Sequence, residues 1–442
     1  MRLRLLAASI ALALTGAAFA QPEAPPLVLP DTVTLDDALK IFRQRGLDLL
    51  IADAAVNNAE GDLKVAGAVP NPNWSLFGSY SFTIGGQTTP VDTASLPSPW
   101  GVSAGLGDSN ALEDSLTGKR WLRLKVAKAA LAAARLSRAD AQRTLELGVK
   151  SAYIAAVLAR DNLDFALQVQ TGANQIFQLN QTRYNAGAIS EADLAKVETL
   201  KLESDQAVDG AEQALRAAKV QLAFLLGVRG RVPDYKVDQD LPKFFVPKPL
   251  SSATVDALLG EAIDHRPDLR ALGFQRDRAL ASIALAKRNR FPDFSLNVQY
   301  SQQAGTTNLA AQPPTVSFGL IGSLPLFYFQ QGEIKKAEAD YRTQQLQRAK
   351  VEAQLVSDVE GAFNAFVSSR KLVERMESRL LDRAKRARDL VSLQYQKGAA
   401  SLLEYLDAQR TFIANNVEYL QDLANYWTAV YQLEAAIGVD LR

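Results

Sequence analysis

The chain has 442 residues, a formal net charge of +1 and no cysteine. The near-neutral charge argues against a nucleic-acid partner, and the missing cysteine excludes disulfides, thiolate metal sites and thiol catalysis. The length allows one large core or two ordinary domains.

The N-terminus has the pattern of an export signal. Two Arg residues precede an apolar run from Leu5 to Leu14, and small residues occupy a cleavage position at 18–20. The run is too short to span a bilayer, so we predict a signal peptide over residues 1–20 and an exported protein. A buried N-terminal helix is the alternative. No later window could span as a helix, so any membrane crossing would use β-strands.

The remaining chain repeats itself at a nearly constant offset. The stretch RYNAGAISEADLAKVETL from Arg183 is matched 211 residues later by QYQKGAASLLEYLDAQRT from Gln394. Further matches occur at an offset of 210 before these stretches and of 220 near the start of each half. A constant offset indicates a repeated structural unit. We therefore predict a first repeat over 21–228, a Pro-rich linker over 229–251 and a second repeat over 252–442.

Each repeat opens with a helix that stops at a proline. The expected helices cover about 35–68 and about 253–290, and they end before Pro70 and Pro292. A hairpin of two alternating strands follows in each repeat, over about 74–110 and about 294–328. The strands are about ten residues long, which suits a tilted membrane strand.

The alternation gives each expected strand one apolar and one polar face. On a membrane sheet, the apolar side chains would face lipid: Trp74, Leu76, Tyr80, Leu296, Val298 and Phe318. Asn297 and Gln299 would face a wet lumen. A soluble sheet with one buried face would produce the same alternation.

A long stretch without proline follows each hairpin, over about 119–185 and about 332–397. Each would form a helix on the order of 100 Å long, which must pack along other helices as a coiled coil. A glycine-centred break then reverses the chain, at about 184–191 and about 395–402. These two tips would lie farthest from the strands, and the returning helices would end at Gly227 and Gly438.

The expected four strands cannot close a membrane sheet by themselves. Unpaired edges are prohibitively costly in lipid, and the smallest single-chain barrels have eight strands. Several copies of the chain must therefore share one barrel.

These features resemble the TolC-like outer-membrane efflux proteins over essentially all of the mature chain. The resemblance rests on the two tips, on HRPDLRAL from His265, and on LPLFYFQQGEIKKAEADY from Leu324. It implies a mainly α protein with a membrane β-barrel: a homotrimer with twelve strands on a long periplasmic α-barrel. It also implies the exit duct of a tripartite pump in the outer-membrane lipid, with a periplasmic adaptor and an inner-membrane pump of the resistance-nodulation-division type.

The resemblance assigns roles to residues near the tips. Glu404 and Asp407 match acidic positions that form rings at the closed end, and such rings would raise the proton affinity of their carboxylates. Tyr395 matches a tyrosine that bonds an acid on the first tip, here Asp193. Ala400 replaces a basic residue of the family pattern, so a latch using that residue is not expected. The adaptor would dock on the tips: Gly187, Ala188, Ile189, Ser190, Gly398, Ala399, Ala400, Ser401 and Leu402.

Other functions remain as alternatives. The same fold could serve type I protein secretion. A periplasmic coiled-coil scaffold without a channel is another alternative, but the apolar strand faces argue against it. An exported enzyme is disfavoured because no His, Cys and acid cluster is present; His265 is expected to be a helix-end residue. We expect no catalysis, cofactor or metal site. The stretch 332–336 resembles the metal-efflux branch more than the drug branch, and the cargo stays open between metal ions, drugs and protein.

Overall fold

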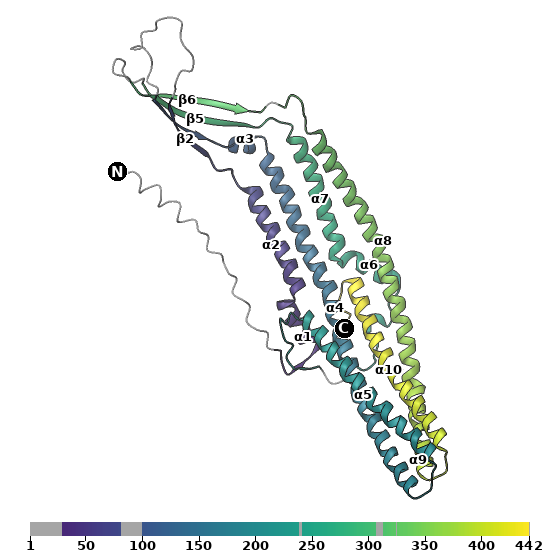
Figure 1. The fold of residues 1–442 in the computed structure, drawn as a ribbon. Helices are drawn as coiled ribbons and strands as arrows, with labels where there is room; N and C mark the ends of the chain where they lie inside the picture. The colour runs from purple at the N-terminus through teal and green to yellow at the C-terminus, as the bar shows by residue number, and fades with distance from the viewer. Residues whose placement is uncertain (1–28, 81–99, 238–240, 306–312, 324, 442) are drawn as a thin grey trace, which may run out of the picture.

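The computed structural model describes residues 29–80, 100–237, 241–305, 313–323 and 325–441. The predicted signal peptide and the tips of both β-hairpins lie outside this part of the chain. The molecule is a long bundle of helices with its strands at one end and the two helical tips at the other, as expected (Figure 1).

The opening helix of the first repeat is divided in two. Helix α1 covers Leu35–Arg45 and α2 covers Leu47–Gly67, whereas the sequence predicted one helix over about 35–68. Gly46 lies between them with φ −56° and ψ 119°, outside the helical region, and its N–H still bonds the Phe42 carbonyl. A side chain at Gly46 would collide with the Phe42 ring, so this bend requires glycine.

The opening helix of the second repeat is divided at the equivalent place. Helix α6 covers Val255–His265 and α7 covers Pro267–Arg288, instead of one helix over about 253–290. The physical reason is Pro267, which disfavours the helical conformation at Arg266 and occupies the first turn of α7. His265 is the last residue of α6, as predicted.

The strands of the two repeats form one antiparallel sheet. Strands β2 (Asn73–Tyr80) and β3 (Trp100–Gly107) pair within the first repeat, and β5 (Phe294–Gln303) and β6 (Thr315–Gly322) within the second. Strand β3 also pairs with β5, so the order is β2-β3-β5-β6. Strands β2 and β6 are therefore the two edges.

The sheet has one apolar and one polar face, as the alternation predicted. Leu106 lies opposite both Trp74 and Val298, and Val298 lies opposite Phe318, so these side chains share a face. All four are at least 40 % exposed in the single chain. The sheet therefore presents its apolar face to the surroundings instead of burying it against helices.

The first long helix agrees closely with the prediction. After a short helix α3 (Ala111–Leu116), α4 runs without interruption over Lys119–Asn185, and α5 returns over Glu191–Leu225. No helix in the described ranges contains a stretch long and apolar enough to cross a membrane.

The second long helix differs from the prediction of one unbroken helix over about 332–397. Helix α8 covers Gln331–Arg375, a π-helical turn covers Met376–Leu380, and α9 continues over Leu381–Gln396 before α10 returns over Leu402–Ile437. The repeat offset is 210 before this turn and 211 after it. The π-turn therefore accommodates one additional residue in the second repeat.

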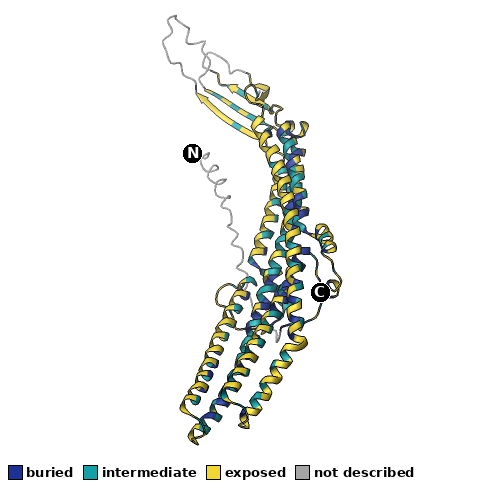
Figure 2. Cartoon of the chain, turned by 90° about the vertical axis from the view of Figure 1, so that its right-hand side faces the viewer, coloured by how far each residue is buried: buried dark blue, intermediate teal, exposed yellow. Residues whose placement is uncertain are grey.

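The helices of the two repeats lie side by side. Helix α2 packs on α4, α4 on α7 and α7 on α8, so that α2 and α8 are the outer helices beneath the edge strands (Figure 1). Figure 2 shows buried residues along the middle of the bundle, whereas the strands and tips are mostly exposed.

The linker is packed against the bundle. Its strand β4 (Lys236–Val237) pairs in parallel with β1 (Thr32–Val33), and a 3-10 turn, η2, covers Lys248–Leu250. The carbonyl of Pro242 accepts from Trp427 Nε1 at 2.7 Å, and that of Phe245 from the Tyr426 hydroxyl at 2.8 Å. The linker thus covers the central core and fastens the first repeat to α10.

Candidate functional site

The candidate site is the pair of helical tips, each reversed by a glycine. Gly187 has φ 69° and Gly398 has φ 79°, a left-handed conformation that side chains other than glycine rarely adopt. Space for a Cβ atom is open at both positions, so backbone conformation and not crowding requires the glycine.

A serine caps the helix that follows each tip. The Asp193 N–H donates to Ser190 Oγ at 3.1 Å, and the Glu404 N–H donates to Ser401 Oγ at 3.3 Å. In the second tip the cap is reciprocal, because the Ser401 N–H donates to Glu404 Oε2 at 2.7 Å. This capping box fixes the Glu404 carboxylate against the start of α10.

Capping changes the proton affinity of both acids. Hydrogen bonds from the Ser401 backbone and then its hydroxyl lower the pKa of Glu404. Hydrogen bonds from the Ser190 hydroxyl and Lys196 lower the pKa of Asp193. In the single chain the pKa of Glu404 is thus lowered, because the cap stabilises the charged carboxylate. A ring of carboxylates is expected to raise it.

Glu404 and Asp407 both lie exposed near the start of α10. Asp407 forms no ion pair with the described residues of its own chain. The expected rings require neighbouring copies, so the gate formed by Glu404 and Asp407 stays a prediction.

The predicted bond between Tyr395 and Asp193 is not formed within the single chain. The buried Tyr395 hydroxyl donates instead to Asn180 Oδ1 at 2.5 Å. Asp193 is engaged by its cap and by Lys196, whose Nζ lies 3.2 Å from Asp193 Oδ1. The Asp193 carboxylate already accepts a hydrogen bond from Ser190 in its own helix cap, whereas Asn180 on α4 lies within hydrogen-bond distance of the Tyr395 hydroxyl.

Arg183 connects the two tips from the other side of Tyr395. Its guanidinium lies 5.1 Å from the centre of the Tyr395 ring and donates to the Gln396 carbonyl at 3.0 Å. The Tyr395 ring also stacks on Tyr405, with 5.2 Å between centroids. The prediction had missed Asn180, Arg183 and Tyr405; the first two lie three residues apart on one face of α4, a helical spacing that could have indicated them.

A small separate core joins the tips. It consists of Ala173, Ile176, Val197, Leu200, Tyr395 and Tyr405. The first four residues come from the first repeat and the two tyrosines from the second, so this core holds the two hairpins to each other. Ala400 and Leu402 pack against it.

The proposed docking residues therefore divide into two groups. Ile189, Ala400 and Leu402 are half-buried and support the tips. The remainder are exposed: Gly187, Ala188, Ser190, Gly398, Ala399 and Ser401. The exposed group presents small side chains and backbone, so a partner could approach both turns closely.

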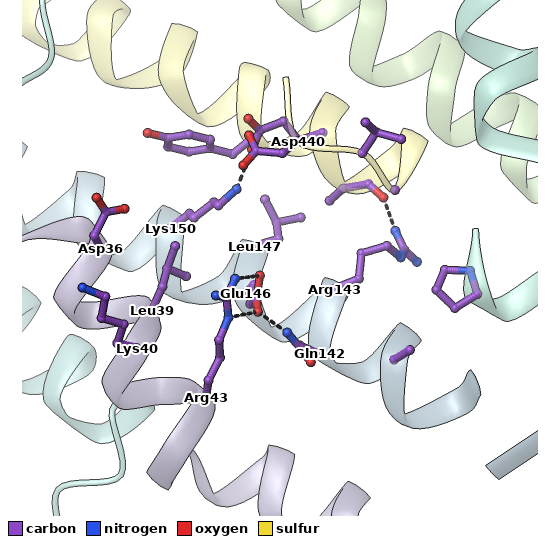
Figure 3. Close-up of a pocket in the computed structure, with 17 residues that line it drawn as sticks. Asp36, Leu39, Lys40, Arg43, Gln142, Arg143, Glu146, Leu147, Lys150 and Asp440 are labelled. Atoms are coloured by element: carbon purple, nitrogen blue, oxygen red, sulfur yellow. Dashed lines mark hydrogen bonds and ion pairs between the residues drawn. The ribbon is translucent and has the colours of Figure 1, made fainter. Parts of the chain in front are cut away.

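A charged pocket lies where α1 meets α4 and the end of α10 (Figure 3). Arg43 donates to both Glu146 oxygens, at 2.7 and 3.1 Å, and Lys150 Nζ lies 2.5 Å from Glu434 Oε2. Burial would raise the pKa of Glu146, but the bonds from Arg43 and Gln142 outweigh it and lower the pKa. These charges neutralise one another in pairs, and the Lys150–Glu434 pair joins the first repeat to α10 of the second.

The described residues contain no group of three or more His, Cys, Asp or Glu that could hold a metal ion. His265 Nδ1 lies 2.9 Å from the Glu261 carbonyl oxygen, one helical turn back, which is a local helix-end contact.

Comparison with known proteins places this geometry in context. The profile of the family described as outer membrane efflux protein matches residues 38–228 and 258–439. The pyoverdine export outer membrane protein OpmQ of Pseudomonas aeruginosa is 26 % identical, covering 92 % of this chain and 84 % of OpmQ. The cobalt-zinc-cadmium resistance protein CzcC of Cupriavidus metallidurans is 21 % identical, covering 92 % and 90 %.

The fold is shared with solved channel structures. The open state of the Neisseria gonorrhoeae MtrE outer membrane channel superposes with a TM-score of 0.75 at 20 % identity. The match covers 92 % of this chain and 89 % of MtrE.

Proposed function

The chain belongs to the outer membrane efflux protein family, and from this premise we propose that three copies form the exit duct of a tripartite efflux pump. Proteins of this family work in the outer membrane with adaptors and inner-membrane pumps. In the proposed trimer, three four-stranded sheets close one twelve-stranded barrel, and the helices continue it into the periplasm.

The observation that carries the proposal is the sheet with two open edges and an exposed apolar face. Among the described residues, strands β2 and β6 have no partner on their outer sides, and Trp74 and Phe318 on the apolar face are 78 % and 81 % exposed. Such edges invite pairing with another chain, and closure into a barrel removes them. The exposed apolar face then contacts outer-membrane lipid.

The opposite end of the molecule is the proposed partner surface. The small exposed residues of the two tips would receive the hairpin end of a periplasmic adaptor, which in turn joins an inner-membrane pump of the resistance-nodulation-division type. Glu404 and Asp407 from three copies would restrict the opening at this end.

The proposed duct is passive and has no enzymatic activity. Transport energy would come from the inner-membrane partner. The likeness to a pyoverdine export protein and to a cobalt-zinc-cadmium resistance protein favours small cargo, namely metal ions or small organic molecules.

The decisive experiment is the mass of the mature protein in detergent by light scattering or native mass spectrometry. A mass of three protomers is expected, together with ion conductance after reconstitution in a planar bilayer. A monodisperse monomer with intact β-structure, or a trimer that conducts no ions after removal of the tip acids, would contradict the duct.

A further inference from the structure

The two repeats already form one contact of the kind that a neighbouring copy would have to make. Strand β3 ends the first repeat's hairpin and β5 begins the second's, and they pair antiparallel. In this contact Gly105 lies opposite Gln299, and Ala104 opposite Tyr300. If several copies join into a ring, β6 of one copy would pair with β2 of the next in the same way as β3 pairs with β5 within one copy.

The hairpin registers define which positions of the two repeats correspond. Strand β2 corresponds to β5 at an offset of 220, so Trp74 corresponds to Phe294. Trp74 lies opposite Leu106, and Phe294 lies opposite Gly322. Position 106 therefore corresponds to 322, an offset of 216 between β3 and β6.

Applying these offsets to the internal contact gives a register between copies. The pair of Gly105 and Gln299 becomes Ile321 (105 + 216) opposite Ser79 (299 − 220) of the next copy. The pair of Ala104 and Tyr300 becomes Leu320 opposite Tyr80 of the next copy.

A separate feature of the sheet fits this register. The polar face carries Ser, Thr, Asn, Gln and Gly at all described strand positions except two, Phe77 and Ile321. These side chains are 62 % and 60 % exposed, and they lie on the two opposite edge strands, so they cannot meet within one chain. With Ile321 opposite Ser79, Phe77 becomes its diagonal neighbour across the contact between copies.

We propose that β6 of one copy pairs with β2 of the next in this register, and that Phe77 and Ile321 pack against each other across the resulting seam. This deepens the proposed trimer, on which it rests. Diagonal neighbours on antiparallel strands are separated by about 7–8 Å, within reach of an aromatic and a branched side chain. The two apolar exceptions would then shield each other on a face otherwise lined by polar residues.

The occupant of both edges is a second copy of this chain because the two edges are complementary to each other. Outer helix α2 lies beneath β2 and outer helix α8 beneath β6, so one contact would join strands and helices together. Pairing of two β2 edges or of two β6 edges would instead produce closed dimers and leave the other edge open.

The chain has no cysteine, so paired cysteines test the seam without background. The variant Ser79→Cys with Ile321→Cys is treated with an oxidant or a short thiol cross-linker, after its trimeric mass has been verified. Ser79→Cys with Ser317→Cys is the matched control, because position 317 lies exposed on the same face four residues along β6. Each single variant is a second control for like-edge pairing.

A covalent trimer from the 79–321 pair, at least several-fold more abundant than from the 79–317 pair, is the expected result. Preferential cross-linking of the control pair, or no cross-linking in a verified trimer, would overturn the register while leaving the trimer intact. Covalent dimers from a single variant would show like edges pairing and also overturn it. A monomeric mass would overturn the trimer itself.

The Phe77–Ile321 contact has its own readout in the temperature at which the trimer dissociates. Phe77→Ser and Ile321→Ser should each lower it, and the double variant should lower it by clearly less than the sum, because the two side chains act as one contact. Strictly additive shifts would show that they do not touch.

Discussion

At the scale of single residues, the two tips share their capping chemistry but differ in charge. Ser190, Asp193 and Lys196 correspond to Ser401, Glu404 and Asp407 at the offset of 211. The first tip neutralises its acid with the lysine, whereas the second has a further acid at that position. Glu404 and Asp407 thus form no ion pair with the described residues of their own chain, whereas Asp193 is paired with Lys196.

This asymmetry gives a prediction for ion selectivity. The variant Glu404→Gln with Asp407→Asn should weaken cation preference and raise conductance, since it removes two carboxylates per copy from the proposed opening. Glutamine can still accept the Ser401 N–H, so the cap is retained. The measurement is the reversal potential in a planar bilayer under a salt gradient. An unchanged reversal potential would exclude both residues from the opening.

A matched control refines that test. Glu203→Gln with Asp209→Asn removes the same charge from exposed positions on α5 and should leave the reversal potential unchanged.

The charge of Glu404 also sets the pH range of this test. Because the pKa of Glu404 is lowered, its carboxylate stays charged below about pH 4.3, the ordinary pKa of a glutamate. Its capping contribution is present above that value and is lost as the pH falls through the lowered pKa.

At the scale of elements, the π-turn at Met376–Leu380 explains why the offset changes by one. Without it, the additional residue would rotate everything between the turn and the tip by about 100°. Tyr395 would then no longer point at Asn180. The turn itself is held by the Tyr419 hydroxyl, which donates to Glu377 Oε1 at 2.7 Å.

Deleting one residue from this turn should be tolerated. Removal of the exposed Ser378 should yield a continuous helix in which the second repeat matches the first, with little change in trimer dissociation temperature. Removal of Gln168, an exposed residue at the corresponding level of α4, should prevent assembly because α4 has no residue to spare. Equal damage from both deletions would refute this account of the turn.

The strand alternation gives a second prediction at this scale. Val298→Arg places a charge on the apolar face and should cost about 2–4 kcal/mol near the bilayer midplane. Gln299→Arg, one residue along β5, should cost much less because the polar face is wet. Urea titration of trimers folded into lipid vesicles measures both. Equal losses would indicate that the two faces of the sheet do not differ in their contact with lipid.

At the scale of the whole molecule, the bundle separates two different surfaces. The sheet lies at one end of the long helices and the two tips lie at the other (Figure 1). The core around Trp427 and the small core at Tyr395 and Tyr405 are distinct, with the long helices between them. Changes at the tips should therefore leave membrane insertion intact.

A charge at the docking tip tests this separation. Ala399→Glu introduces a bulky charge at an exposed position and should abolish efflux while leaving the trimer and its export unchanged. Ala399→Ser is the matched control and should retain efflux. Susceptibility of a deletion strain carrying each variant provides the measurement. Full resistance with Ala399→Glu would remove this tip from the docking surface.

The local elements could be predicted from the sequence alone. Alternation gave the strand faces, the absence of proline gave α4 from Lys119 to Asn185, and the two glycines gave the tips. Each of these follows from interactions within a few residues, which one chain segment contains in full. The split at Gly46 was missed, whereas the split at Arg266 was anticipated only in the prediction that His265 lies at a helix end.

The side-chain contacts between the two repeats could not be predicted in this way and became known from the folded chain. In the folded chain β3 pairs with β5, Tyr395 bonds Asn180 instead of Asp193, and Glu404 takes part in the cap of α10. The physical reason is that such contacts depend on the rotation of long helices and on strand register. A shift of one residue, such as the one absorbed by the π-turn, changes every partner beyond it.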